Sequence, residues 1–172
     1  ADKIFVHMVD FYQKKDDTPW VDEAMLLRLA AKADLHRPNL TGNPAPLLTL
    51  SDENDVMVSV QSIQSPMLLL VFYSPLCNHC MEFMPGIYQT WLDYEKSGLK
   101  AVAVNTDDQF NHWRQFVSQQ QWRWTDLADP TGKSTFERDY AAYNLPVIYL
   151  LDKNKKILRK RIEPAQLGEV LG

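Results

Sequence analysis

The most apolar run in the chain is residues 67–73, Met-Leu-Leu-Leu-Val-Phe-Tyr. Successive side chains of a strand point to opposite faces of a sheet, so a run without polar alternation predicts a strand that is buried on both faces. A second apolar run, at residues 99–104, predicts a neighbouring strand of the parallel type. Together the two runs predict the centre of a sheet that other elements cover on both sides.

The spacing of apolar residues in the rest of the main part of the chain switches between the periods of helices and strands. The pattern predicts helices at about 77–96, 109–120 and 134–143, a β-hairpin with strands at 47–50 and 56–60, a closing hairpin with strands at 147–151 and 156–162, and a short final helix from about Pro164. Gly98 follows the first of these helices, and glycine commonly ends a helix. Strands that alternate with helices and then close in an antiparallel hairpin predict an α/β fold with a central mixed β-sheet flanked by helices.

The N-terminal part of the chain has a purely helical pattern. Apolar residues from Ile4 to Tyr12 recur at helical spacing and predict a helix over 3–14. A second helix is predicted at about 20–34, and Thr18-Pro19 provides residues that favour its first turn.

Residues 37–46 are rich in proline, glycine and asparagine and mark a boundary. We therefore predict an N-terminal helical segment at 1–41 and a main domain at 42–172. No charged-then-apolar signal segment opens the chain, and its first residues resemble the inside of a domain. We expect the helical segment to be the tail of a truncated upstream region.

The composition excludes several classes of protein. The 172 residues are 45% hydrophobic and 23% charged, which is typical of a globular chain and not of a disordered one. The formal net charge of -4 provides no basic surface for nucleic acid. The most apolar run is far shorter than the ~20 residues that span a bilayer, so we expect no membrane-spanning segment.

The candidate chemistry lies in Cys77-Asn78-His79-Cys80, which holds the only two cysteines of the chain directly after the predicted central strand. Thiol–disulfide exchange requires a thiolate nucleophile and a second thiol that resolves the mixed disulfide. A cysteine in the first turn of a helix faces unpaired backbone N–H groups and the positive end of the helix dipole, which favour its thiolate. We therefore predict Cys77 as the exposed nucleophile, Cys80 as the resolving thiol, and His79 as a group that favours the thiolate and makes the couple more oxidising.

Two other roles compete for the cysteine pair. A structural disulfide is one, although a bridge that closes so short a loop adds little stability. Metal binding by Cys77, His79 and Cys80 is the other, although one Cys-x-x-Cys supplies only half of a typical zinc shell. The remaining histidines, His7, His36 and His112, show no ligand spacing. We expect no metal and no cofactor apart from a redox-active Cys77–Cys80 disulfide.

Several segments around the cysteines carry a resemblance to a known family. They are Pro44-Ala45-Pro46 with the hairpin after it, the approach to Cys77 at residues 69–77, Pro85 five residues after Cys80, and residues 144–152 with Leu145-Pro146. In order and spacing they resemble the thioredoxin superfamily, in particular its extracytoplasmic TlpA/ResA-like thiol-disulfide interchange proteins. The resemblance covers about three-quarters of the chain, from about Gly42 to Gly172.

The resemblance implies a thioredoxin fold with an N-terminal β-hairpin and a helical insertion before a cis-proline at Pro146. It also implies that Leu145 and Pro146 hold the backbone of a substrate protein beside the cysteines, and that Leu76, directly before Cys77, is a further substrate-binding residue. The implied activity is that of a thiol-disulfide oxidoreductase, which exchanges electrons with cysteine-containing protein substrates and with an upstream thiol-disulfide donor or acceptor. The implied protein is a monomer in the periplasm or elsewhere outside the cytoplasm.

The sequence departs from the family pattern at the acid that assists the resolving cysteine. Thioredoxin has a buried aspartate where this chain has Val71, and some TlpA/ResA-like proteins have a glutamate where this chain has Phe83. Helical geometry points the neighbouring Glu82 elsewhere. Asp107 and Asp108 follow the second predicted parallel strand and are candidates by position, but the pattern favours solvated loop carboxylates. The sequence alone names no base for Cys80.

Two rival functions remain open. Peroxiredoxins place a threonine or serine three residues before the reactive cysteine, as Ser74 is here, but the proline expected four residues earlier is Leu70. A thiol peroxidase is therefore one alternative. A non-catalytic thioredoxin-fold binding module with a structural disulfide is the other. The direction of electron flow also stays open, because His79 favours an oxidising couple whereas the family resemblance favours a reductant.

Overall fold

A five-stranded mixed sheet forms the centre of the main domain in the computed structural model, which describes residues 2–13 and 22–172. The strands are β3 (Met67–Tyr73), β4 (Leu99–Asn105), β5 (Thr125–Leu127), β6 (Val147–Asp152) and β7 (Ile157–Lys160). Their order across the sheet is β5-β4-β3-β6-β7. β3, β4 and β5 are parallel, whereas β6 and β7 run antiparallel to their neighbours. The predicted mixed sheet with a closing hairpin is confirmed.

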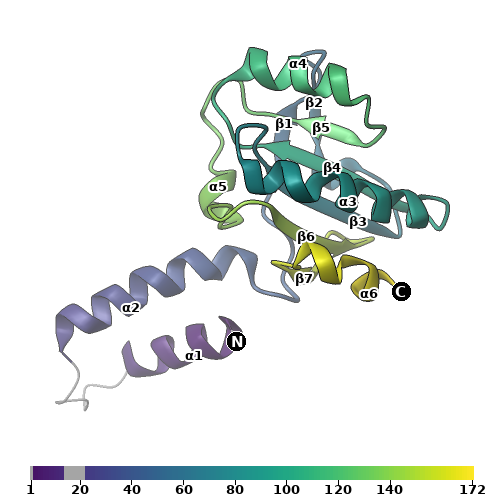
Figure 1. The fold of residues 1–172 in the computed structure, drawn as a ribbon. Helices are drawn as coiled ribbons and strands as arrows, with labels where there is room; N and C mark the ends of the chain where they lie inside the picture. Colours follow the sequence, from purple (N-terminus) through teal and green to yellow (C-terminus); the bar gives the residue numbers. More distant parts are fainter. Residues whose placement is uncertain (1, 14–21) are drawn as a thin grey trace.

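Helices and a small hairpin cover the two faces of the sheet (Figure 1). The main-domain helices are α3 (Asn78–Glu95), α4 (Phe110–Gln120), α5 (Phe136–Asp139) and α6 (Leu167–Leu171). Side chains from α3, α4 and α6 pack on one face, and α5 packs on the other together with the hairpin of β1 (Thr49–Ser51) and β2 (Met57–Ser59). Short 3-10 turns lie at Arg37–Asn39, Val60–Ser62 and Pro164–Gln166.

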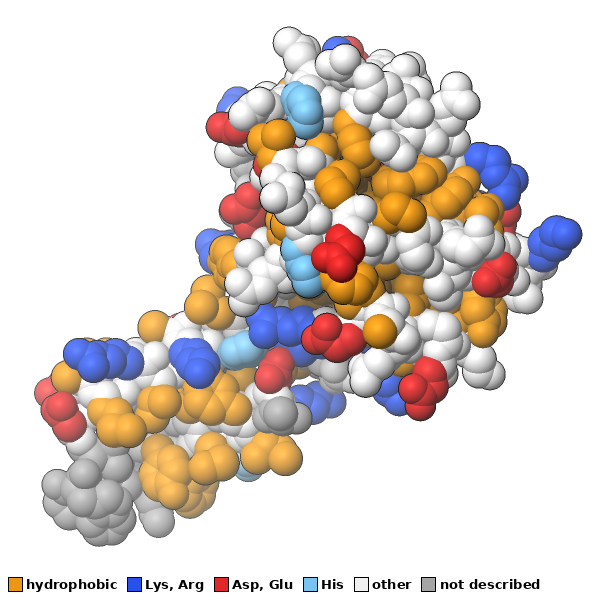
Figure 2. All heavy atoms as spheres, viewed as in Figure 1, with side chains coloured by type: hydrophobic (Ala, Val, Ile, Leu, Met, Phe, Trp, Pro, Cys, Tyr) orange, Lys and Arg blue, Asp and Glu red, His pale blue; other side chains and the backbone are white. Residues whose placement is uncertain are grey.

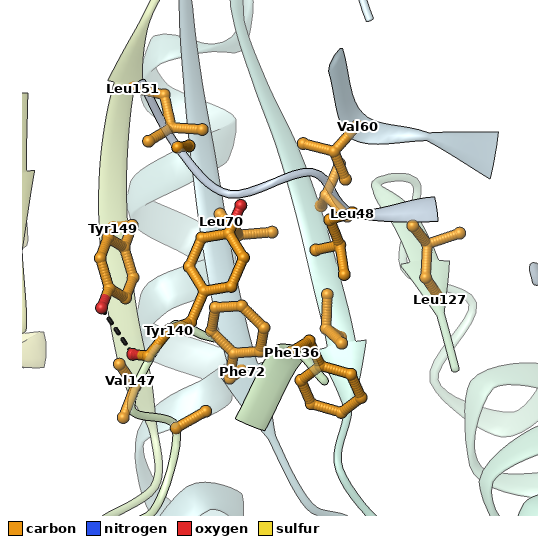
Figure 3. Close-up of a cluster of buried hydrophobic side chains, with 14 of the residues drawn as sticks. Leu48, Val60, Leu70, Phe72, Leu127, Phe136, Tyr140, Val147, Tyr149 and Leu151 are labelled. Atoms are coloured by element: carbon orange, nitrogen blue, oxygen red, sulfur yellow. Dashed lines mark hydrogen bonds between the residues drawn. The ribbon is translucent and has the colours of Figure 1, made fainter. Parts of the chain in front are cut away.

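The alternation of β3 side chains explains the uninterrupted apolar run. Leu68, Leu70 and Phe72 point into the layer that holds α5 and the hairpin. Phe72 contacts Tyr140 there at a ring distance of 4.9 Å, and the Tyr149 hydroxyl donates a hydrogen bond of 2.5 Å to the Tyr140 carbonyl (Figure 3). Because the intervening residues point into the α3 layer, β3 has no solvent-facing side and needs no polar alternation.

Two elements differ from the sequence-based expectation. β5 was not predicted, since it has only three residues and its middle one, Asp126, is polar. The helix predicted at 134–143 is much shorter in the structure, where only Phe136–Asp139 is α-helical. Ala141 adopts a positive φ of 48°, which a helix does not continue through. The helical insertion before the cis-proline is therefore present as a single turn.

The N-terminal residues form two helices, α1 (Asp2–Gln13) and α2 (Glu23–His36). The predicted capping pair Thr18-Pro19 lies outside the described residues; within them, Asp22 caps α2 by accepting a hydrogen bond of 3.2 Å from the Ala24 N–H. The helices enclose a small core of their own, and Figure 2 shows hydrophobic side chains gathered on the viewed face of this pair. The boundary between the segments 1–41 and 42–172 stays a prediction.

Lys160 of β7 joins the helical pair to the main domain. Its Nζ lies 2.5 Å from an Asp2 carboxylate oxygen and donates a hydrogen bond of 2.7 Å to the Asn39 side chain. Asn39 in turn donates a hydrogen bond of 2.9 Å to the Asp139 carbonyl. These contacts place α1 and α2 beside the β7 edge of the sheet (Figure 1).

A buried carboxylate ties β5 to β3. Asp126 is only 3% exposed and accepts hydrogen bonds of 2.7 Å from the Tyr73 hydroxyl and 2.9 Å from the Trp124 indole N–H. Burial raises the pKa of Asp126 to about 7, even though both hydrogen bonds favour its charged form. The carboxyl group therefore holds its proton to much higher pH in the folded chain than in the unfolded one.

We predict that Asp126 makes the stability of the fold fall as the pH rises. The unfolded chain releases this proton near pH 4 and the folded chain only near pH 7, so the free energy of unfolding decreases between these values, by an amount on the order of a few kcal/mol. Asp126→Asn should lack this decrease, which urea denaturation at a series of pH values will measure. Asp108→Asn, at an exposed carboxylate, is the control. Parallel pH profiles for wild type and Asp126→Asn would contradict the assignment.

Candidate redox site

The two cysteines lie at the junction of β3 and α3, as the sequence predicts. Cys77 is the N-cap residue of α3, and its Sγ accepts a hydrogen bond of 3.3 Å from the Cys80 backbone N–H. The Cys77 N–H donates to the Ser74 carbonyl at 3.1 Å, which closes a turn between the end of the strand and the start of the helix. The sulfur of Cys77 thus takes the place of the oxygen that usually caps a helix, where backbone N–H groups favour a negative charge.

The environments of the two thiols differ. Cys77 is half-buried, whereas Cys80 is fully buried at 0% exposure in the layer between the sheet and α3. Burial, followed by the hydrogen bond with Cys77, raises the pKa of Cys80 to about 12. The accessible thiol is thus the one at the helix end, and the inner thiol is held in its neutral form.

His79 is exposed on the first turn of α3 and packs against the ring of Phe83, with a centroid distance of 4.7 Å. Phe83 occupies the position at which some TlpA/ResA-like proteins have a glutamate. At this position the chain therefore has an aromatic ring in contact with His79 and no carboxylate. Glu82 is exposed, in agreement with the helical geometry argued from the sequence. Neither residue supplies a buried acid to Cys80.

A groove beside the first turn of α3 brings three of the predicted site residues together. His79, Leu145 and Pro146 line it, with Tyr143 and Arg161 at its other walls, and its volume is ≈ 400 Å³. The Leu145–Pro146 peptide bond is cis, as the resemblance implies. Leu145 also packs against the buried cluster that contains Cys80, which connects the groove to the cysteine pair.

Leu76 lies outside this groove and is 50% exposed. It precedes Cys77 in the turn, so its apolar side chain stands on the surface beside the half-buried thiol. A larger hollow of ≈ 790 Å³ lies at the opposite end of the parallel strands, against Trp91, Leu99 and Trp124, and it contains none of the predicted site residues.

A link between Ser74 and Asp107 has no signal in the sequence pattern. The Ser74 hydroxyl donates a hydrogen bond of 2.7 Å to the Asp107 carboxylate and accepts one of 3.0 Å from the Leu76 N–H. The two residues are far apart in the sequence and meet because β3 and β4 end side by side, with Tyr73 opposite Asn105. Asp108, the other candidate, is exposed.

No group of three or more His, Cys, Asp or Glu side chains suited to a metal ion occurs within residues 2–13 and 22–172. None of the helices in this described part is long and apolar enough to cross a membrane.

Comparison with known proteins places this site in a family. The sequence profile of the AhpC/TSA family matches residues 41–160. The chain belongs to the AhpC/TSA family. The matched segment contains the hairpin, the cysteine pair and the cis-proline, and it excludes both α1 and α2.

Several relatives carry names that describe thiol–disulfide chemistry. The thiol-disulfide oxidoreductase ResA of Bacillus thuringiensis is 22% identical over 119 residues, which are 69% of this chain and 68% of that protein. A domain of a possible thiol-disulfide isomerase from Cytophaga hutchinsonii is 30% identical, with a TM-score of 0.68, and the match covers 78% of this chain and 92% of that one. The predicted thioredoxin-like fold and the predicted thiol-disulfide oxidoreductase are thus confirmed.

A longer structure shows that the fold of the whole chain occurs elsewhere. A thioredoxin-like protein from Bacteroides caccae is 21% identical with a TM-score of 0.81, and the match covers 99% of this chain and 62% of that one. The arrangement of helical pair and thioredoxin domain is therefore shared with that protein as a fold.

We predict that Cys80 resists alkylation in the folded protein. In Cys77→Ser, iodoacetamide should modify Cys80 at pH 8 at least about ten-fold more slowly than in the same variant unfolded in urea, because burial, the largest cause of the raised pKa of Cys80, remains when Cys77 is replaced. The rate, followed by mass spectrometry, should still be rising with pH at pH 9, because burial holds the pKa of the Cys80 thiol above its ordinary value. A rate that levels off below pH 9 would show that the Cys80 thiol is not suppressed in this way.

Proposed function

We propose that Cys77 and Cys80 carry out the thiol–disulfide exchange in two steps. The Cys77 thiolate attacks a disulfide of a partner protein, forms a mixed disulfide and releases one partner thiolate. Cys80 then loses its proton and attacks Cys77 Sγ; the Cys77–Cys80 bond forms, and the second partner thiolate leaves. The partner is reduced by two electrons and this chain is oxidised by two, and in reverse the same steps oxidise a dithiol.

The accessibility of the two sulfurs is the single observation that carries this assignment. Cys77 is half-buried at the helix end, so a partner disulfide can reach it, whereas Cys80 is fully buried and can meet only a sulfur that is already attached to Cys77. The sulfur of Cys77 is also the one that accepts a helix N–H. The order of the steps follows from this difference.

The groove at the cis-proline suits the backbone of the partner. Leu145 and Pro146 line the groove together with His79 and the exposed Tyr143, so an extended segment laid there would lie beside the first turn of α3, whose N-cap residue is the half-buried Cys77. Backbone pairing beside a strand end is a general mode of peptide recognition that requires no fixed side chain in the partner. We therefore assign Leu145 and Pro146 to partner binding, with Leu76 as an apolar surface contact.

We propose cysteine-containing proteins outside the cytoplasm as partners, together with one upstream thiol-disulfide donor or acceptor. This location fits chemistry on protein disulfides, since disulfides persist in oxidising compartments. The monomeric state is a proposal as well.

Trapping of the mixed disulfide tests the two-step assignment. Cys80→Ser should accumulate a covalent adduct with insulin or another protein that contains a disulfide, because it lacks the thiol that resolves the mixed disulfide at Cys77. Cys77→Ser should form almost none, since its only thiol is buried. Non-reducing gel electrophoresis measures the adducts, and the chain has no other cysteine to confuse them. Equal adduct formation in the two variants would contradict the assignment. In addition, the reduced wild-type protein should reduce insulin, whereas neither variant should.

Replacement of His79 tests its tuning role. His79 stands exposed beside Cys77 in the first turn, so its positive form favours the reduced, thiolate-bearing state. His79→Gln should therefore make the couple more reducing by about 10–30 mV, where 30 mV corresponds to about 1.4 kcal/mol. Equilibration with glutathione measures the potential, and Gln89→Ala on the same helix, at an exposed site, is the control. An unchanged potential would remove His79 from the redox chemistry.

The thiol-peroxidase and binding-module alternatives stay predictions. The Ser74 hydroxyl, which the peroxidase alternative requires, donates to Asp107 and accepts from the Leu76 N–H. Consumption of hydrogen peroxide in proportion to added protein would revive the peroxidase. A reduction potential below about -300 mV, typical of structural disulfides, would favour the binding module.

A further inference from the structure

The buried thiol of Cys80 needs a proton acceptor, and neither position used by the relatives supplies one. Val71 is apolar and belongs to the same buried layer as Cys80, and Phe83 packs on His79. The reaction still requires that the proton leave Cys80 when this thiol attacks the mixed disulfide. The proton acceptor must therefore come from an element other than β3 and α3.

Asp107 is held beside the cysteine turn by a specific set of hydrogen bonds. Its carboxylate accepts the Ser74 hydroxyl at 2.7 Å, and Ser74 is the residue whose carbonyl accepts the Cys77 N–H at 3.1 Å. Its backbone is fixed by the buried Asn105, whose amide donates to the Asp107 carbonyl at 3.0 Å and whose oxygen accepts the Asp107 N–H at 3.2 Å. These hydrogen bonds to its backbone and its carboxylate fix Asp107 beside the cysteine turn, unlike a loop carboxylate that contacts only solvent.

Solvent can reach the same carboxylate from the other side. Asp107 lines a hollow of ≈ 180 Å³ at the ends of β4 and β5, which provides an exit for a proton. The other carboxylates of this hollow are Asp108, Asp129 and Glu137. Asp108 and Glu137 are exposed, and Asp129 is occupied by the turn after it, where it accepts the Thr131 and Ser134 N–H groups at 3.0 and 2.6 Å. In the described part of the chain, Asp107 is the carboxylate of this hollow that is bonded to the cysteine turn.

We propose that Asp107 accepts the proton of Cys80 during resolution of the mixed disulfide, and that Ser74 positions Asp107 for this step. The inference rests on the proposed two-step function. In the step, the Cys80 S–H bond breaks and its proton ends on the Asp107 carboxylate. The Cys80 sulfur bonds to Cys77, the bond between Cys77 and the partner breaks, and the partner thiolate leaves with the electron pair. No other reactant is needed.

The electrostatics of Cys80 support the order of events. Its pKa is raised by burial, then by the hydrogen bond with Cys77, and also by the negative charges of Cys77 and Asp107, while the Ser74 backbone amide opposes the rise. The charge of Asp107 therefore reaches the thiol. When Cys77 is bonded to a partner, its thiolate is gone, so the obstacle to losing the proton falls just when the proton must leave.

Reaction with 5,5′-dithiobis(2-nitrobenzoate) separates the two steps. The Cys77 thiolate releases one thionitrobenzoate as it forms the mixed disulfide, and attack by Cys80 releases the second. The leaving thiolate needs no proton, so the second phase reports the deprotonation of Cys80. We compare wild type with Asp107→Asn, which keeps an oxygen that can accept the Ser74 hydroxyl, and with Asp108→Asn as the matched control.

We expect the second phase of Asp107→Asn to be at least about ten-fold slower than that of wild type at pH 7, as for the loss of a general base. Its rate should rise ten-fold per pH unit over pH 6–9, whereas wild type should change less, because hydroxide replaces the missing carboxylate. Added formate should accelerate the second phase of Asp107→Ala. Asp108→Asn should match wild type, and Ser74→Ala should slow the second phase by a smaller factor than Asp107→Asn.

Two outcomes overturn the inference. A second phase of Asp107→Asn with the rate and pH slope of wild type shows that Asp107 takes no proton. A rate lowered equally at every pH, without rescue by formate in Asp107→Ala, shows that Asp107 is only structural. Absence of the second phase in wild type itself would instead contradict the proposed two-step function. A first phase with the rate of wild type shows that the surroundings of Cys77 are intact in each variant.

Discussion

Burial of β3 on both faces is the constraint on which the site depends. The strand packs Leu70 and Phe72 against one layer and Val71 and Tyr73 against the other, so neither face can shift without opening a core. Its end therefore delivers the cysteine turn to a fixed point. The neighbouring strands β4 and β6 then bring the Asp107 turn and the cis-proline to the same end of the central strands as the cysteine turn.

The central part of this arrangement could be predicted from the sequence. An apolar run without alternation identifies a doubly covered strand, and a Cys-x-x-Cys directly after it identifies the helix end that carries the chemistry. Pro146 was assigned from the resemblance, and the structure shows its peptide bond as cis. These predictions succeed because each depends on residues that are close in the sequence or on a pattern that the family repeats.

The rest could not be predicted because it depends on strand register. β5 has three residues and is held by Asp126, whose partners Tyr73 and Trp124 give no signal in the hydrophobic pattern. The Ser74–Asp107 bond exists only because Tyr73 and Asn105 are opposite each other in the β3–β4 pair. A shift by one residue would turn the side chains of β4 to the other face, and the sequence does not reveal which register forms.

The burial of Cys80 imposes two opposing demands on the site. A neutral, inaccessible thiol cannot be alkylated or react with a stray disulfide, and the apolar layer around Cys80 provides that protection. The same burial opposes the loss of the proton that resolution requires. An acid buried directly under the thiol, as in thioredoxin, would need its own desolvation. A carboxylate at the rim avoids most of this cost, since Asp107 has the Ser74 hydroxyl on one side and an open hollow on the other. Replacement of the buried acid by Val71 thus becomes compatible with exchange chemistry, because the proton acceptor is provided by the loop after β4 and not by β3 itself.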